Sequence, residues 1–92
     1  MAVLLIVEDD TATNEAICEY MSSAGHKVLS AFDGEHGLQI AREKSIDLVV
    51  LDIMLPKRTG LEVLKELRQT SGIPVLMLTA LDDEPTQAAS FD

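Results

Sequence analysis

The sequence has no tryptophan, one cysteine, only three aromatic side chains, and 7 basic residues against 16 acidic ones. A single cysteine excludes an internal disulfide framework and a cysteine-based zinc site. With so few aromatics, a core has to be built from Leu, Val, Ile and Met. A formal charge of -9 repels nucleic-acid phosphates and anionic lipid, so we expect neither direct nucleic-acid binding nor membrane binding.

Two nucleotide-binding motifs are also absent. Neither Gly-x-Gly-x-x-Gly nor Gly-x-x-x-x-Gly-Lys-Ser/Thr occurs, which argues against dinucleotide and P-loop nucleotide binding. The first apolar run is too short for a signal peptide or a membrane span, so we expect a cytoplasmic protein. A length of 92 residues is typical of one small domain.

Apolar runs alternate with amphipathic segments along the chain. The runs predict strands over 3–7, 28–31, 47–51 and 74–79, and the segments predict helices over 11–24, 34–44, 61–69 and from Asp82 to the end. The expected apolar faces are Ala16, Ile17, Tyr20, Met21 and Ala24 in the first helix, and Leu61, Leu64 and Leu67 in the third. This order predicts an α/β fold, a doubly wound parallel sheet with helices on both faces.

Carboxylates follow two of the strands. Glu8 and Asp9 come after the first strand, and Asp52 comes after the third, at the sheet edge where open α/β sheets bind ligands. Such a cluster of hard oxygens, without His or Cys, suits Mg²⁺, and an Asp there can attack phosphorus. Thr79 ends the fourth strand and can donate a hydrogen bond to a phosphoryl oxygen, while the small Ala80 leaves room beside Asp52. Asp10 is expected to cap the first helix.

At these residues the chain resembles the receiver domain of bacterial two-component response regulators. The stretch around Asp52 is most similar to the winged-helix transcription-factor branch of that family. The segments that carry the resemblance are Leu4–Asp10, Asp33-Gly34, Asp47–Pro56, Gly60–Leu64 and Ile73–Ala80. The resemblance implies a flavodoxin-like, CheY-like fold with strand order 2-1-3-4.

The resemblance also implies roles for individual residues. Asp52 would be the phosphoacceptor, Asp9 would bind Mg²⁺ directly and Glu8 through water, and the backbone carbonyl of Met54 would complete the protein ligands. Thr79 would be the switch hydroxyl. The implied function is to accept a phosphoryl group from a sensor histidine kinase and to regulate an output domain, most plausibly a DNA-binding transcriptional one. The domain would be a phosphoacceptor and not an enzyme.

The chain departs from the family pattern at its end. A receiver has a fifth strand carrying Lys-Pro and a fifth helix, and this sequence stops at Asp92 before either. No lysine of the chain can therefore be assigned the family's phosphate-contacting role. We expect residues 1–92 to be a receiver incomplete at its C-terminus, without an output domain. Because an exposed edge strand invites pairing, a homodimer or strand-swapped dimer is an expected alternative to the monomer.

Two other functions are compatible with parts of the pattern. A pseudo-receiver, which serves only as a protein-interaction module, is favoured by the missing lysine and opposed by the acids. A Mg²⁺-dependent phosphohydrolase usually carries a second Asp two residues after its nucleophile, and Met54 stands there. Lys57, Arg58 and both histidines are expected to be surface groups.

Overall fold

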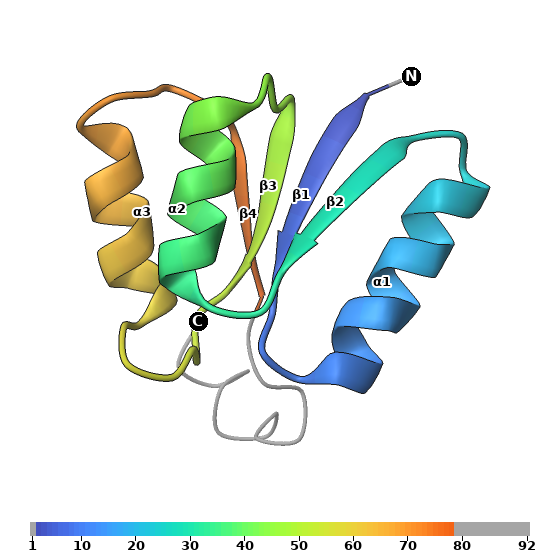
Figure 1. The fold of residues 1–92 in the computed structure, drawn as a ribbon, viewed down its shortest axis with the longest axis horizontal. Helices are drawn as coiled ribbons and strands as arrows, with labels where there is room; N and C mark the ends of the chain where they lie inside the picture. Colours follow the sequence, from blue (N-terminus) through green and yellow to red (C-terminus); the bar gives the residue numbers. More distant parts are fainter. Residues whose placement is uncertain (1, 79–92) are drawn as a thin grey trace, which may run out of the picture.

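A computed structural model of the chain describes residues 2–78, and Figure 1 shows strands alternating with helices. The elements are β1 (Val3–Val7), α1 (Thr11–Ser23), β2 (Lys27–Ala31), α2 (Gly34–Glu43), β3 (Leu48–Asp52), α3 (Gly60–Arg68) and β4 (Val75–Leu78). Every strand and helix that the sequence predicts within this range is confirmed, with ends that differ by at most one residue. The predicted end of the fourth strand at Thr79 lies outside the described residues. The helix expected from Asp82 onward lies outside the described residues.

The four strands form one parallel sheet in the order β2-β1-β3-β4, which confirms the predicted order. Val7 lies opposite Ala31 on one side and Leu51 on the other, so β1 and β2 end at the same level and β3 ends one residue further. Since β2 and β3 flank β1 on opposite sides, right-handed crossovers place α1 and α2 on opposite faces of the sheet. Helices α2 and α3 pack beside each other, apart from α1 (Figure 1).

Apolar side chains of the two central strands alternate between the two faces of the sheet. One set packs with side chains from α2, α3 and the loop before α3, and consists of Leu5, Val7, Val49 and Leu51. Helix α2 comes unusually close to the sheet at Gly37, where a Cβ atom would lie 2.8 Å from a methyl carbon of Val7. Packing therefore requires a glycine at this position. Among the other residues of the two central strands, Leu4, Ile6 and Val50 are buried as well.

The predicted apolar faces of two helices were partly wrong. Tyr20 in α1 is 72% exposed and Leu61 in α3 is 58% exposed. The buried positions are Val63 and Leu67 in α3 and, in α1, the polar Asn14. Residues spaced three and four apart lie on one face of a helix, and adjacent faces show the same spacing. The spacing therefore does not distinguish these faces, and contact with the sheet determines which one is buried.

Side chains cap each of the three described helices. Asp10 accepts a hydrogen bond from the Thr13 N–H at the start of α1, which confirms its predicted capping role, and Asp33 does the same at α2. Thr59 and Glu62 form a reciprocal capping box at α3. Within residues 2–78, no helix has the length and apolar character needed to cross a bilayer.

Candidate functional site

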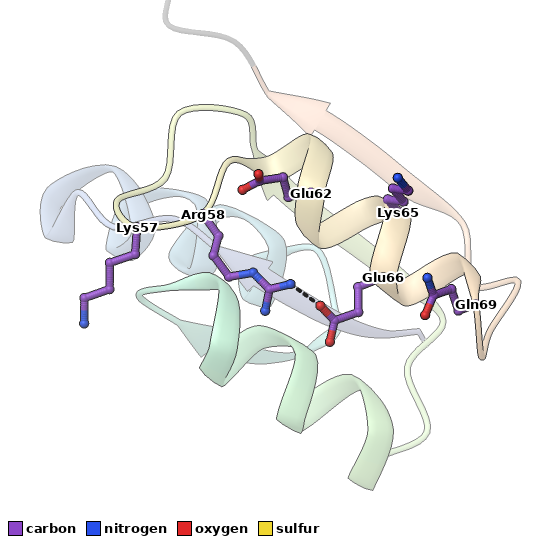
Figure 2. A pocket seen from close by; sticks show the side chains of 6 residues that line it. All are labelled: Lys57, Arg58, Glu62, Lys65, Glu66 and Gln69. Carbon is purple, nitrogen blue, oxygen red and sulfur yellow. Dashed lines mark hydrogen bonds and ion pairs between the residues drawn. The ribbon is translucent and has the colours of Figure 1, made fainter.

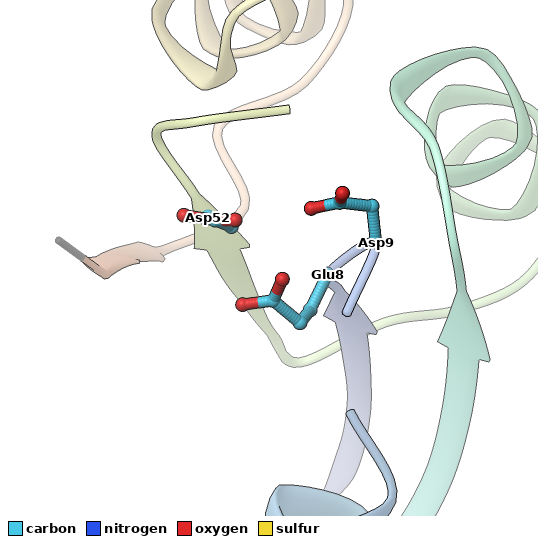
Figure 3. Close-up of side chains that lie close together, drawn as sticks. All are labelled: Glu8, Asp9 and Asp52. Carbon is cyan, nitrogen blue, oxygen red and sulfur yellow. The ribbon is translucent and has the colours of Figure 1, made fainter. Parts of the chain in front are cut away.

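Three carboxylates meet where β1 and β3 end. Glu8 and Asp9 follow the last residue of β1, Asp52 is the last residue of β3, and carboxylate oxygens of all three lie within 4.8 Å of one another. Figure 3 shows the three side chains gathered at this edge of the sheet. Glu8 and Asp52 are each only 7% exposed, and Asp9 is exposed to solvent. The sequence therefore predicted this cluster correctly, because parallel register brings the two strand ends together.

Glu8 is held at three of its polar groups. Its backbone N–H donates to the Ala31 carbonyl oxygen over 3.1 Å, and its side-chain Oε2 accepts a hydrogen bond from the Asp10 N–H over 2.9 Å. Its own carbonyl oxygen accepts a hydrogen bond from the Asn14 side chain. Burial raises the pKa of the Glu8 carboxyl to about 7, and the nearby Asp52 charge adds to this effect against the Asp10 hydrogen bond.

Asp52 stands where the chain leaves β3. The Met54 N–H donates to Asp52 Oδ1 over 3.1 Å, while the Ile53 N–H continues the sheet by donating to the Leu78 carbonyl over 3.0 Å. Gly60 closes the loop against this point, because a Cβ atom there would lie 2.2 Å from the Asp52 carbonyl oxygen. The backbone on both sides of Asp52 is thus fixed, and the Met54 N–H also holds the orientation of the Asp52 carboxylate.

The donor set fits a hard divalent cation. It consists of carboxylate oxygens alone, from one exposed and two buried side chains, without a nitrogen or sulfur ligand. Mg²⁺ binds through one or two carboxylates plus water and phosphate oxygens. It would favour the ionised form of Glu8, which burial and then the nearby Asp52 charge disfavour. Met54 lies beside this cluster with an exposed side chain, and its carbonyl remains a predicted ligand. Thr79 and Ala80 lie outside the described residues.

An ion-pair network lies beside the site, and the sequence did not predict the part in it of Arg58, which was expected to be a surface group. Arg58, in the loop between β3 and α3, pairs with Glu35 of α2 and with Glu66 of α3, and Glu66 also pairs with Arg42. Figure 2 shows Arg58 reaching across to Glu66 at a shallow hollow of ≈ 470 Å³. The pairing raises the pKa of Arg58 and lowers that of Glu66. This network attaches the loop after Asp52 to both neighbouring helices.

Asn14 is the second residue that sequence reasoning missed. It is 1% exposed, and its Nδ2 donates to the carbonyl oxygens of Glu8 and Ala31 over 2.9 and 3.1 Å. A usable signal was present, because Asn14 shares a helical stripe with the half-buried Ile17, Cys18 and Met21. An amide on such a stripe indicates buried partners.

The fold and the site together define a doubly wound α/β domain with an acidic pocket at the carboxyl edge of its sheet. The chain belongs to the response regulator receiver domain family, whose model matches residues 4–92. Among curated proteins, it is 44% identical over 84 residues to the transcriptional regulatory protein YcbL of Bacillus subtilis, which is itself uncharacterized. That match covers 91% of this chain but 37% of YcbL, so the chain spans little more than a third of this relative.

Two solved structures show the same fold. One is the response regulator TrrA of Thermotoga maritima in complex with Mg²⁺-BeF, which is 30% identical to this chain with a TM-score of 0.83. The match covers 99% of this chain and 80% of the TrrA chain. TrrA in complex with the histidine kinase ThkA has a TM-score of 0.81 at 33% identity and covers 87% and 70%, respectively. These likenesses confirm the predicted receiver fold.

Proposed function

We propose that Asp52 accepts a phosphoryl group from a phosphohistidine of a sensor kinase, with Mg²⁺ held at Glu8 and Asp9. The phosphorylated domain would regulate the output of a longer transcription regulator in the cytoplasm. The observation that carries this proposal is the convergence of the Glu8, Asp9 and Asp52 carboxylates within 4.8 Å at the sheet edge. The Mg²⁺-BeF and kinase complexes of the similar TrrA support the metal and the kinase partner.

The chain's own groups divide the work of phosphoryl transfer. The Met54 N–H holds Asp52 Oδ1, so Oδ2 attacks phosphorus in line with the bond to the histidine nitrogen. The O–P bond forms as the N–P bond breaks, and the nitrogen keeps the electron pair of that bond. Positioning of this kind supplies much of the catalysis of phosphoryl transfer.

The acid pair would hold the metal beside Asp52. Mg²⁺, when bound, neutralises negative charge that develops on the phosphoryl oxygens. Asp9, which is exposed, and Glu8, which is buried, would hold it, and Met54 would contribute its carbonyl. Glu8 has to be ionised for this role, although burial favours its neutral form.

The remaining roles extend beyond the described residues. Thr79 would act as the switch hydroxyl that moves toward the phosphoryl group, beside the small Ala80, so that phosphorylation shifts the population between two arrangements. The chain would be a phosphoacceptor, not an enzyme, that assists its own phosphoryl transfer and dephosphorylation. Because it spans 37% of YcbL, the output domain would belong to the rest of the parent protein.

Phosphorylation of Asp52 can be tested directly. The chain is incubated with Mg²⁺ and acetyl phosphate, and intact mass spectrometry measures the gain of one phosphoryl group. Asp52→Asn should abolish the gain, and Asp9→Ala should reduce it at limiting Mg²⁺. Asp47→Asn is the matched control, because Asp47 precedes the opposite end of the same strand and accepts a hydrogen bond from the Val3 N–H.

The outcomes separate the candidate functions. A phosphoryl gain that is lost in Asp52→Asn and kept in Asp47→Asn supports the proposal. No gain in the unmodified chain, under conditions where Mg²⁺ binds, would favour an interaction module of the same fold. Continuous release of phosphate from a phosphomonoester would instead favour a phosphohydrolase.

A further inference from the structure

Asn14 connects the first turn of α1 to the ends of two strands. Val7 and Ala31 are the last paired residues of β1 and β2, and both Nδ2 hydrogens of Asn14 are used just beyond them. One donates to the Glu8 carbonyl oxygen over 2.9 Å and the other to the Ala31 carbonyl oxygen over 3.1 Å. The amide therefore extends the pairing of the two strands by one step.

The orientation of this amide is fixed from its other side. Cys18, one turn further along α1, donates its S–H to Asn14 Oδ1 over 3.3 Å. With the oxygen occupied in this way, both amide hydrogens face the carbonyls of Glu8 and Ala31. Within residues 2–78, no buried side-chain nitrogen or oxygen atom lacks a partner, so the arrangement is complete.

The hydrogen bonds of Asn14 restrain the residue that carries the buried acid of the site. The Glu8 carbonyl is bonded to Asn14, and the Glu8 N–H is bonded to Ala31, whose carbonyl also accepts from Asn14. Without the amide, the Glu8 carbonyl would lose its Asn14 donor and the Ala31 carbonyl one of its two donors, and the backbone of Glu8 would be tied to β2 only through its N–H. The course of this backbone sets the direction of the Glu8 and Asp9 side chains.

The burial of apolar surface does not explain an amide at this position. Asn14 is 1% exposed on a helical face that packs against the sheet, where an apolar side chain of similar size would contribute more burial energy. Leucine has a similar volume but no donor, and ionised aspartate would repel both carbonyls. The two donors are what distinguish asparagine here.

We infer that Asn14 is a positioning residue for the cation site: its amide clamps the Glu8 and Ala31 carbonyls and so aims the Glu8–Asp9 pair at Asp52. This inference rests on the proposed function of that site. Residues that orient metal ligands without contacting the metal typically change affinity by 10- to 100-fold when replaced. An effect of that size, with the fold retained, is the expected signature.

The test uses two variants of Asn14 and one control. Asn14→Leu keeps the volume and removes both donors, and Asn14→Ala provides a second variant that admits water if the first folds poorly. Ile46→Ala is the matched control, because Ile46 is buried at 8% exposure just before β3, at the edge opposite the acids. It should destabilise the fold without touching the site.

Two quantities are measured for each variant. Calorimetry gives the Mg²⁺ dissociation constant, which should rise about tenfold in the Asn14 variants and less than about twofold in Ile46→Ala. In metal-free protein, amide hydrogen exchange at Glu8, relative to Val50 in the centre of β3, should accelerate by about fivefold or more in the Asn14 variants, as expected for a lost hydrogen bond. The ratio to Val50 removes changes in global stability.

Each outcome decides the inference. Weaker Mg²⁺ binding together with faster relative exchange at Glu8, both specific to Asn14, supports it. Unchanged Mg²⁺ affinity in both Asn14 variants, or an equal loss in Ile46→Ala, overturns it. If the unmodified chain itself binds no Mg²⁺, the proposed function fails. In that case amide hydrogen exchange still tests whether Asn14 restrains Glu8. An unchanged ratio of the exchange rates at Glu8 and Val50 would show that it does not.

Discussion

Replacing Glu8 with glutamine should stabilise the metal-free domain at alkaline pH. Glu8 is 7% exposed as a residue, and its carboxyl lies beside those of Asp9 and Asp52. Burial raises its pKa from the ordinary 4.5 to about 7, so the folded state binds this proton more tightly than the unfolded state. Glutamine has the shape of the protonated acid and can still accept the hydrogen bond of the Asp10 N–H.

The size and direction of the effect follow from the two pKa values. The native contribution of Glu8 is fully present below pH 4.5 and is lost as the pH rises through about 7. The full difference corresponds to about 3 kcal/mol in the free energy of unfolding. Glu8→Gln should therefore match the unmodified chain near pH 4 and exceed it by about 3 kcal/mol at pH 8. Against a typical total of about 5–15 kcal/mol, this gain is large.

Urea unfolding followed by circular dichroism, in EDTA at both pH values, measures the effect. Glu19→Gln controls for the loss of one negative charge, because Glu19 is exposed on α1. It should change stability by less than about 0.5 kcal/mol at either pH. In saturating Mg²⁺ at pH 8 the advantage of Glu8→Gln should shrink, because the cation stabilises only the chain that binds it well.

The reasoning fails if Glu8→Gln gains no more stability at pH 8 than at pH 4. It also fails if Glu19→Gln gains as much, because the effect would then reflect the net charge of -9 and not the buried acid. A destabilising effect of Glu8→Gln at pH 8 in EDTA would mean that the ionised form is the one the folded domain prefers.

Two further predictions concern the first residue of α3 and the loop that precedes it. Gly60→Ala should destabilise the domain by about 2 kcal/mol or more, because its Cβ would lie 2.2 Å from the Asp52 carbonyl oxygen. Gly72→Ala, whose Cβ would meet no atom within 4 Å, should be nearly neutral in the same urea titration, and equal losses would contradict the close approach. Lys57→Gly should stabilise the domain by about 0.5–1 kcal/mol. The φ of 69° at Lys57 costs a side-chain residue about 1–2 kcal/mol, and the greater freedom that glycine loses on folding offsets part of this gain. Lys65→Gly, in the middle of α3, should cost about 1 kcal/mol instead, and thermal unfolding that ranks the two lysine variants alike would refute the assignment of strain.

The order of strands and helices could be predicted from the sequence because it depends on local patterns. Continuous apolar runs such as Val3–Val7 indicate buried strands, and Asp10, Asp33 and Gly25 mark helix ends through hydrogen bonding and backbone freedom. Which stripe of each helix is buried could not be predicted in the same way. Tyr20 is exposed although it shares the predicted apolar face, because packing against the sheet selects among overlapping stripes.

The chemistry of the site was determined by the sequence itself. The sequence places the carboxylates of Glu8, Asp9 and Asp52 at the ends of strands, and parallel strands bring these ends to one edge of the sheet. Their energetics were decided only by the tertiary structure. Burial of Glu8 raises its pKa to about 7, and the Asn14 amide reaches carbonyls on two strands, 6 and 17 residues away in the chain. Such effects arise because the cost of a buried charge and the partner of a buried amide depend on neighbours that only folding brings together.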